Sequence, residues 1–176
     1  MLVRWRRMAH LGVVVLLVAV VAAGCGKKSE EKLAEGLMEK TIEGATGGDA
    51  DVDLGGGDVT IKTQEGTTTI SETSEWPGDM FDGVPKFTYG KVTNVTRLDQ
   101  TQSGQKTVSV HLSELEGGGA EKYAKELEAA GWDMQVVMSA GEGGMINAQK
   151  GDLGLALMYN TTEKHAVLSV LKGLDE

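Results

Sequence analysis

The chain has 176 residues and a formal net charge of −9 at neutral pH, with every acidic residue placed after residue 24. This acidity disfavours nucleic acid and anionic lipid as partners, because both are themselves negatively charged. The only cysteine is Cys25, which excludes an internal disulfide and a cysteine-based metal site. The remaining length is enough for one ordinary domain with a hydrophobic core.

The first 25 residues fall into three segments of different character. Three arginines precede an apolar run from Leu11 to Ala23, and small residues then lead into Cys25. This order is typical of a secretory signal peptide. A membrane-spanning helix is one alternative, but the fifteen residues from Leu11 to Cys25 cover only ~22 Å at about 1.5 Å per residue, against a hydrocarbon core about 30 Å thick. A secreted protein cleaved after Gly24, with no role for Cys25, is another.

The sequence Ala22-Ala23-Gly24-Cys25 resembles the lipobox of bacterial lipoproteins, although Ala22 stands where that family usually has leucine. The resemblance implies a diacylglyceryl group on the Cys25 sulfur and cleavage just before this residue. Two acyl chains suffice for a stable anchor, because each buried CH₂ contributes ~0.8 kcal/mol. We therefore expect a signal peptide over residues 1–24 and a palmitate-type lipid anchor in the cell envelope. The anchor would lie on the outer face of the cytoplasmic membrane or in an outer membrane.

A helix is expected after the anchor, within a tether segment of residues 25–48. Its glutamate-rich polar face argues against a position on the membrane surface. We expect its apolar stripe to cover the small sheet that follows, until Gly47-Gly48 ends the helix. The apolar residues at helical spacing are Leu33, Leu37, Met38, Ile42 and Ala45.

Residues 49–73 are predicted to form a small β-meander of three short strands with glycine turns. Its acidic start, with Asp49, Asp51 and Asp53, matches the opening of an EF-hand calcium loop. Leu54 and Thr60 stand where that loop needs glycine and glutamate. We interpret the stretch as a strand with its carboxylates outward and with Val52 and Leu54 inward.

A linker with two prolines is expected over residues 74–86, and its Trp76, Met80 and Phe81 could pack against the domain that follows. Residues 87–176 predict the order β-β-α-β-β-β-β with short hairpin loops, and the first of these strands has uneven alternation that suggests a bulge. The fold class is therefore α+β. It consists of an antiparallel sheet with one helix packed on one face, preceded by a small helix plus β-meander unit.

The predicted helix of this domain, residues 120–130, has a recognisable C-terminal signal. Gly131 occupies the position of a left-handed C′ residue, and Trp132 could fold back onto Leu127 in a Schellman ending.

The strand near residues 153–159 is apolar on both faces. Leu153, Leu155, Leu157 and Tyr159 would face the helix, while Gly154, Ala156 and Met158 make the opposite face unusually apolar. That opposite face is either covered by the N-terminal unit or the linker, or it is a surface for a partner. In the second case Ala156 and Met158 are the candidate partner surface. The methionines at 134, 138, 145 and 158 are interpreted as core and near-core filler.

Candidate catalytic, cofactor and metal residues are not found. His111 and His165 could approach each other if their strands were adjacent, but no further ligand is spaced to join them, so we interpret both as surface residues. No nucleophile elbow, phosphate-binding loop or paired-carboxylate motif occurs.

Residues 35–70 resemble a unit seen in uncharacterised bacterial lipoproteins, through Asp51–Leu54, Val59–Thr63 and the Glu-Gly-Thr turn. Residues 120–132, the linker and Phe87–Lys91 resemble the rest of that group. The resemblance implies an envelope lipoprotein of unknown function and transfers no catalytic residue. We expect a non-enzymatic accessory module that binds an envelope protein. The alternatives are a small-ligand or metal binder that uses His111 or the acidic strand, and then a hydrolase.

Overall fold

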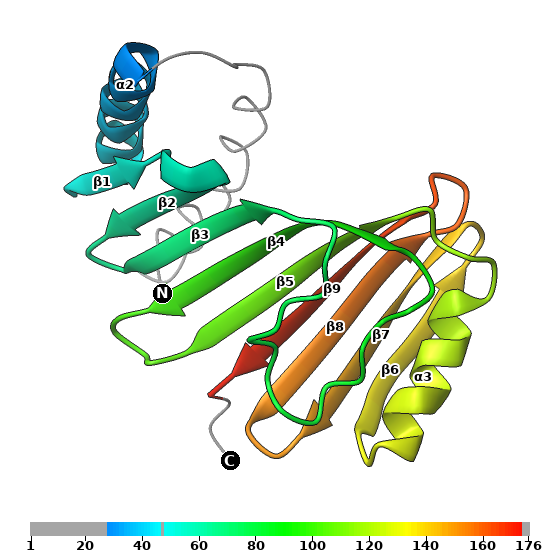
Figure 1. Ribbon diagram of the computed structural model, residues 1–176. Coiled ribbons are helices and arrows are strands. Elements are labelled where there is room, and N and C mark those ends of the chain that lie inside the picture. Colours follow the sequence, from blue (N-terminus) through cyan, green and yellow to red (C-terminus); the bar gives the residue numbers. More distant parts are fainter. Residues whose placement is uncertain (1–27, 47, 174–176) are drawn as a thin grey trace. The chain divides into compact units, whose positions relative to one another are not determined.

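The computed structural model describes residues 28–46 and 48–173, which contain nine strands and two helices. The predicted antiparallel sheet is confirmed, and strands make up most of the described chain (Figure 1). The signal peptide and Cys25 lie outside the described residues. Within those residues, no helix has the length and hydropathy needed to cross a membrane. The chain divides into two compact units, residues 1–65 and 66–176.

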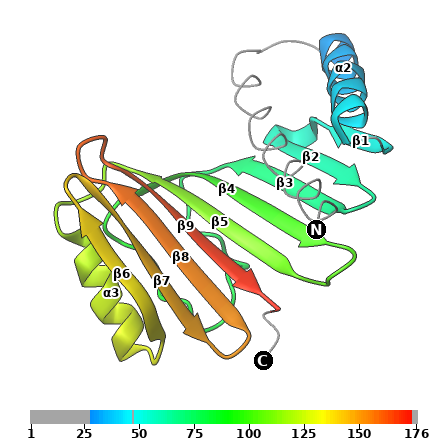
Figure 2. The ribbon, with the colours of Figure 1, turned by 180° about the vertical axis from the view of Figure 1, so that it is seen from behind.

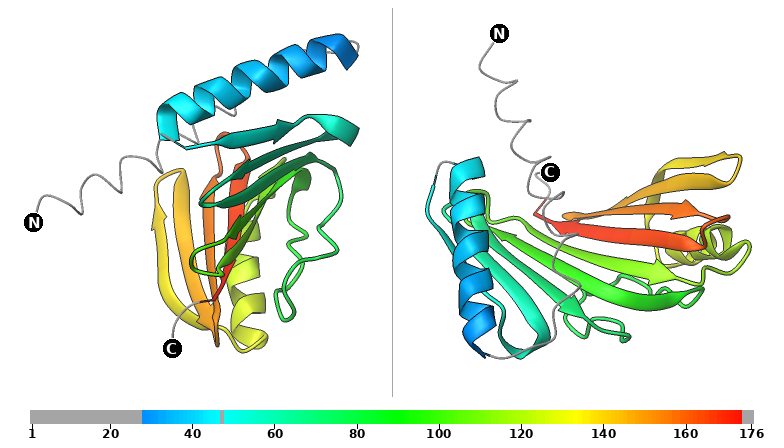
Figure 3. Two further views of the ribbon diagram at one scale, coloured as in Figure 1. Left: turned by 90° about the vertical axis from the view of Figure 1, so that its left-hand side faces the viewer. Right: turned by 90° about the horizontal axis from the view of Figure 1, so that it is seen from above.

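The first unit consists of helix α2 (Lys28–Thr46), strands β1 (Ala50–Asp53) and β2 (Asp58–Thr63), and a 3-10 turn, η2 (Gly55–Gly57). Ile42, Val52 and Ile61 form its small buried core. The predicted stripe is wrong at Leu37, which is 67% exposed. The helix lies alongside β1 (Figure 3), and Met38 and Ile42, on a narrower line, make the apolar contact.

Two glutamates of α2 accept hydrogen bonds from backbone amides at the outer edge of β1. Glu39 Oε1 accepts a hydrogen bond from the Val52 amide, and Glu35 Oε1 accepts one from the Leu54 amide just past the strand, both at 3.2 Å. An edge strand with unpaired amides is a template for pairing with another chain. The acidic face of α2 therefore blocks this edge.

The second unit is a seven-stranded sheet in the order β3-β4-β5-β9-β8-β7-β6, with helix α3 (Gly119–Ala129) on one face. After the linker, the elements follow the predicted order β-β-α-β-β-β-β. The last strand, β9, lies between β5 and β8. The strands are β3 (Gly66–Glu72), β4 (Lys91–Gln100), β5 (Lys106–Ser113), β6 (Asp133–Ala140), β7 (Gly143–Lys150), β8 (Leu153–Asn160) and β9 (His165–Lys172).

The third strand of the expected meander belongs to this second unit. β3 pairs with β4, from Gly66 opposite Gln100 to Glu72 opposite Asn94. Residues 73–90, which connect the two strands, therefore leave the sheet and return to it next to β3. The expected meander ended at residue 73 and the expected main domain began at residue 87. These boundaries place β3 and β4 in different parts of the chain, although the two strands are paired along the whole length of β3. The predicted irregularity in β4 is confirmed as a register shift between Val92 and Asn94.

The core lies between the sheet and α3. Val108, Val110 and Leu112 of β5 alternate along the strand and point inward, and Tyr123 and Leu127 of the helix are fully buried. The predicted Schellman ending is confirmed, because Gly131 has φ +81°, its amide donates to Glu128 O, and the Trp132 amide donates to Leu127 O, both at 3.0 Å.

The linker packs on the same face as α3. The predicted packing of Trp76, Met80 and Phe81 against the core is confirmed. Figure 1 shows the linker and α3 together in front of the strands, and Figure 2 shows both behind them. The expectation that the linker covers the opposite face is therefore wrong.

Hydrogen bonds explain why the linker lies there. Trp132 Nε1 donates to Gly83 O at 3.0 Å, and the Tyr123 hydroxyl donates to Pro85 O at 2.9 Å. Burial raises the pKa of Tyr123, which keeps this hydroxyl a neutral donor. A third attachment is a bidentate ion pair between the Arg97 guanidinium and Asp79, with N–O distances of 2.6 and 2.7 Å. The Arg97 hydrogen bonds lower the pKa of Asp79.

Candidate functional site

Four apolar side chains line up on the sheet face opposite α3. In the ladders, Met138 of β6 lies opposite Met145 of β7, Met145 opposite Met158 of β8, and Met158 opposite Val167 of β9. Directly opposite residues share a face, with their Cβ atoms about 5 Å apart. These four residues, here called the methionine row, therefore form one continuous strip across four strands.

The methionine row is accessible. Met158 is 61% exposed and Met138 is 54% exposed. Leu157, the residue before Met158, is fully buried on the face of the sheet that carries α3. The interpretation of the methionines as filler is wrong for Met138 and Met158, because the β6–β8 register turns both away from the core. It holds for Met134, which packs against the core cluster.

The two residues of the candidate partner surface lie side by side on this face. Ala156, on the strand that carries Met158, is half-buried and lies opposite Asn147 on one side and Ser169 on the other. The face becomes polar towards β5, where the hydroxyls of Ser109 and Ser169 are 2.8 Å apart. The polar side chains of Asn147, Ser169 and Ser109 therefore lie beside the methionine row on this face.

His111 continues the line of the methionine row on β5, opposite Val167. It is half-buried, and this burial lowers its pKa, because a charged imidazolium loses solvation there. Asn94, opposite His111 on β4, carries a buried side-chain oxygen without a hydrogen-bond partner. His165 lies two residues from Val167 on the adjacent strand β9, but its Nδ1 contacts Glu163 at 3.2 Å. Among the described residues, no three histidine, cysteine or acidic side chains gather as metal ligands.

The lowered pKa of His111 predicts a pH dependence of stability. The unfolded imidazole has a pKa of about 6.5, so below that pH the unfolded chain binds more protons than the folded one. We expect the stability contributed by neutral His111 to be complete above about pH 6.5 and to fall as the pH drops below it. Urea unfolding of wild type and His111→Gln between pH 5 and 8 measures this. If the free energy of unfolding changed with pH equally in wild type and His111→Gln, the proposed effect of His111 burial would be contradicted.

The acidic strand forms ordinary surface contacts. Val52 is buried while Asp51 and Asp53 are exposed, which confirms the expected alternation. Asp51 lies 3.9 Å from the Lys62 ammonium, and Asp53 Oδ1 accepts a hydrogen bond from the Gly55 amide at 2.8 Å. Asp53, which matches a calcium-ligand position in the EF-hand pattern, therefore accepts a backbone hydrogen bond at the start of the η2 turn.

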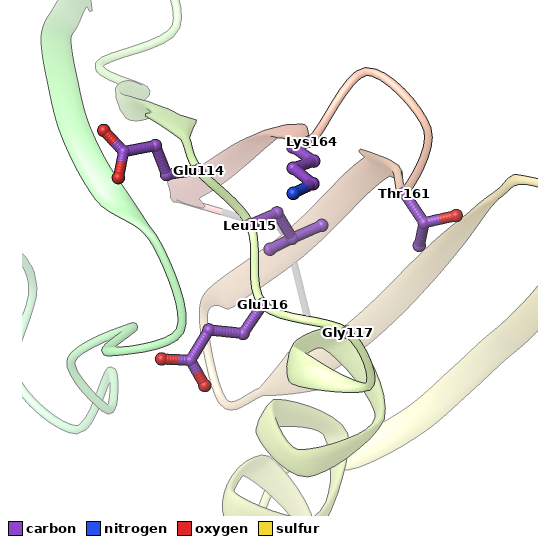
Figure 4. Close-up of a pocket in the computed structure, with 6 residues that line it drawn as sticks. All are labelled: Glu114, Leu115, Glu116, Gly117, Thr161 and Lys164. Atoms are coloured by element: carbon purple, nitrogen blue, oxygen red, sulfur yellow. The ribbon is translucent and has the colours of Figure 1, made fainter.

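An open hollow of about 620 Å³ lies where the β5–α3 connection meets the β8–β9 turn (Figure 4). Glu114 pairs with Lys91 at 2.7 Å, and Glu116 lies 4.0 Å from Lys122. Figure 4 shows both carboxylates pointing away from Lys164 and Thr161. The hollow therefore does not bring an acid and a base together, and no local pattern in the sequence indicates it.

Two non-glycine residues of this hollow have left-handed backbone. Glu114 has φ +51° and Lys164 has φ +53°, and the Leu115 amide donates to Lys164 O at 3.0 Å. Left-handed backbone costs an L-residue about 1–2 kcal/mol, which glycine avoids at some cost in chain entropy.

We expect Lys164→Gly to raise the free energy of unfolding by ~0.5–1 kcal/mol, and Lys164→Val to lower it, because a β-branched side chain tolerates this conformation poorly. Urea denaturation of the three proteins gives both differences. A Lys164→Gly protein less stable than Lys164→Val would contradict the strain.

Comparison of the chain with protein-family models, with curated proteins and with solved structures finds no match.

Proposed function

We propose that the protein is a lipid-anchored, non-enzymatic component of the cell envelope that binds another envelope protein through the methionine row. The anchor is proposed on Cys25, from the small-small-Gly-Cys sequence at residues 22–25. The observation that supports binding is the register of Met138, Met145 and Met158, which places three thioether side chains in one strip with two of them more than half exposed.

The chemistry of the methionine row indicates what kind of partner it fits. Methionine is flexible and polarizable, so a group of exposed methionines adapts to irregular apolar surfaces. The row contains no charged residue, although the chain as a whole is acidic. Its partner is therefore a protein surface with apolar side chains, and not a charged small molecule or nucleic acid.

A charge placed in the row tests the binding function. Met158→Asp is expected to reduce recovery of the partner, after crosslinking in whole cells, by about tenfold or more, since burying an unpaired carboxylate is costly. Gln149→Asp is the matched control, because Gln149 is exposed on the same face but outside the row, opposite Gly154. Full partner recovery by Met158→Asp would refute the assignment of this surface.

The anchor is tested separately with Cys25→Ser in the full chain. We expect radiolabelled palmitate to enter the wild-type protein and not the variant, and the variant to leave the membrane fraction. Palmitate label that persists in Cys25→Ser, or a wild-type protein without label, would contradict the anchor.

A further inference from the structure

The methionines of the protein differ in how far solvent reaches them. Met138 is 54% exposed and Met158 is 61% exposed, and they lie on either side of Met145, which is half-buried. In the part of the chain that the structure describes, the methionines outside the methionine row are Met38, Met80 and Met134. Each of these three packs against a buried core. Exposure therefore separates the two outer thioethers of the row from the methionines that belong to a core.

Exposure decides which thioethers an oxidant modifies, because the oxidant must reach the sulfur from solvent. Hydrogen peroxide is small and uncharged, so the acidity of the chain does not repel it. The sulfur lone pair attacks one peroxide oxygen, and a sulfur–oxygen bond forms as the oxygen–oxygen bond breaks. The sulfur is oxidised to a sulfoxide, while the second oxygen is reduced, takes the proton of the transferred oxygen and leaves as water.

We infer that Met138 and Met158 form a modification site, at which hydrogen peroxide converts both thioethers to sulfoxides and thereby switches off binding by the methionine row. The switch rests on the proposed function, whereas the modification does not. A sulfoxide is polar and accepts hydrogen bonds, so an apolar partner surface would bury it without a donor. Because the two residues flank Met145 in the ladders, their oxidation makes the row polar on both sides of its middle thioether.

The fold tolerates this modification. Both side chains are more than half exposed, so a sulfoxide at either position stays in water and needs no buried partner. Met134 packs against the core cluster, where the same change would place a polar group among apolar side chains. Oxidation of the row therefore leaves the protein folded, and methionine sulfoxide reductases, one for each epimer, can restore the thioethers.

Peptide mass spectrometry after timed exposure to dilute hydrogen peroxide tests the site. The full chain with Cys25→Ser contains no thiol to react in place of methionine. We expect sulfoxide to form at Met138 and Met158 at least about fivefold faster than at Met80 and Met134, because a thioether packed against a core reacts when the surrounding structure opens. Equal rates at Met134 and at Met138 or Met158 would overturn the site.

The stability of the oxidised protein is a second readout. Protein that carries sulfoxide at the row and not at Met80 or Met134 is expected to unfold at the same urea concentration as untreated protein. A lower midpoint would mean that the row supports the core, and it would contradict a modification that the folded protein tolerates.

Crosslinking in whole cells, with and without brief peroxide treatment, tests the switch. Wild type is compared with a protein that carries Met138→Leu, Met145→Leu and Met158→Leu, which keeps the row apolar and removes its thioethers. We expect peroxide to lower recovery of the partner by wild type about tenfold, and to lower recovery by the leucine variant much less relative to its own untreated value. Oxidation of the partner affects both proteins alike, so the difference between them measures oxidation of the row.

The outcomes distinguish the switch from the proposed function. Equal relative losses in the two proteins, or no loss in wild type although its row is oxidised, would overturn the switch and leave the binding surface standing. Untreated wild type that recovers no partner would refute the binding function and the switch together, while the sulfoxide rates still decide whether Met138 and Met158 are the modification site.

Discussion

Leu157→Ala is expected to lower the free energy of unfolding by about 2–5 kcal/mol, while Met158→Ala changes it by less than about 0.5 kcal/mol. The two residues are neighbours in β8, but the alternation of the strand places them on opposite faces. Leu157 is fully buried in the core, where its removal leaves a cavity, whereas Met158 is 61% exposed. This difference follows from the register that places the methionine row on the open face.

Urea denaturation of wild type and both alanine variants at one pH measures the difference. Leu155→Ala is a useful control, because Leu155 is buried on the same face as Leu157 and should also be strongly destabilising. A Met158→Ala protein as unstable as Leu157→Ala would mean that Met158 is buried in the folded protein, and it would remove the basis of the proposed binding surface.

Trp132→Ala is expected to cost about 3–5 kcal/mol of stability and to release the linker from the core. Trp132 is 4% exposed, follows the Schellman ending of α3, and donates its indole N–H to Gly83 O in the linker. Its removal therefore opens a cavity and breaks an attachment between the linker and the core. Trp132→Phe keeps most of the volume and loses the hydrogen bond, so we expect a smaller cost of ~0.5–1.5 kcal/mol beyond repacking.

Limited proteolysis of the linker distinguishes these two effects. Cleavage within residues 74–86 should be fastest in Trp132→Ala, slower in Trp132→Phe and slowest in wild type. Equal cleavage rates in all three proteins would show that Trp132 does not hold the linker, whatever the loss of global stability.

Local patterns in the sequence predicted most elements of the second unit. The alternation of Val108, Val110 and Leu112 with polar residues indicates β5 and its inward face, and Gly131 followed by Trp132 indicates the end of α3. These features depend on residues close together in the chain, so a single sequence contains the information.

Features that depend on distant pairing were not predictable in the same way. β9 pairs with β5, more than fifty residues earlier in the chain, and no local pattern indicates this neighbour. The alignment of Met138, Met145 and Met158 depends on the registers of two ladders, which a one-residue slip would reverse. From the sequence, Glu35 and Glu39 are expected on a solvent-exposed helix face. Their hydrogen bonds to the Leu54 and Val52 amides could not be predicted, because those amides lie outside the helix.

A photoreactive amino acid introduced at position 158, with position 149 as the matched control, tests the proposed binding surface most directly in the cells that make the protein. We expect a discrete adduct with another envelope protein from position 158, in the membrane fraction, that is absent from position 149. Position 158 that gave no adduct, or the same adducts as position 149, would show that the methionine row does not bind an envelope protein.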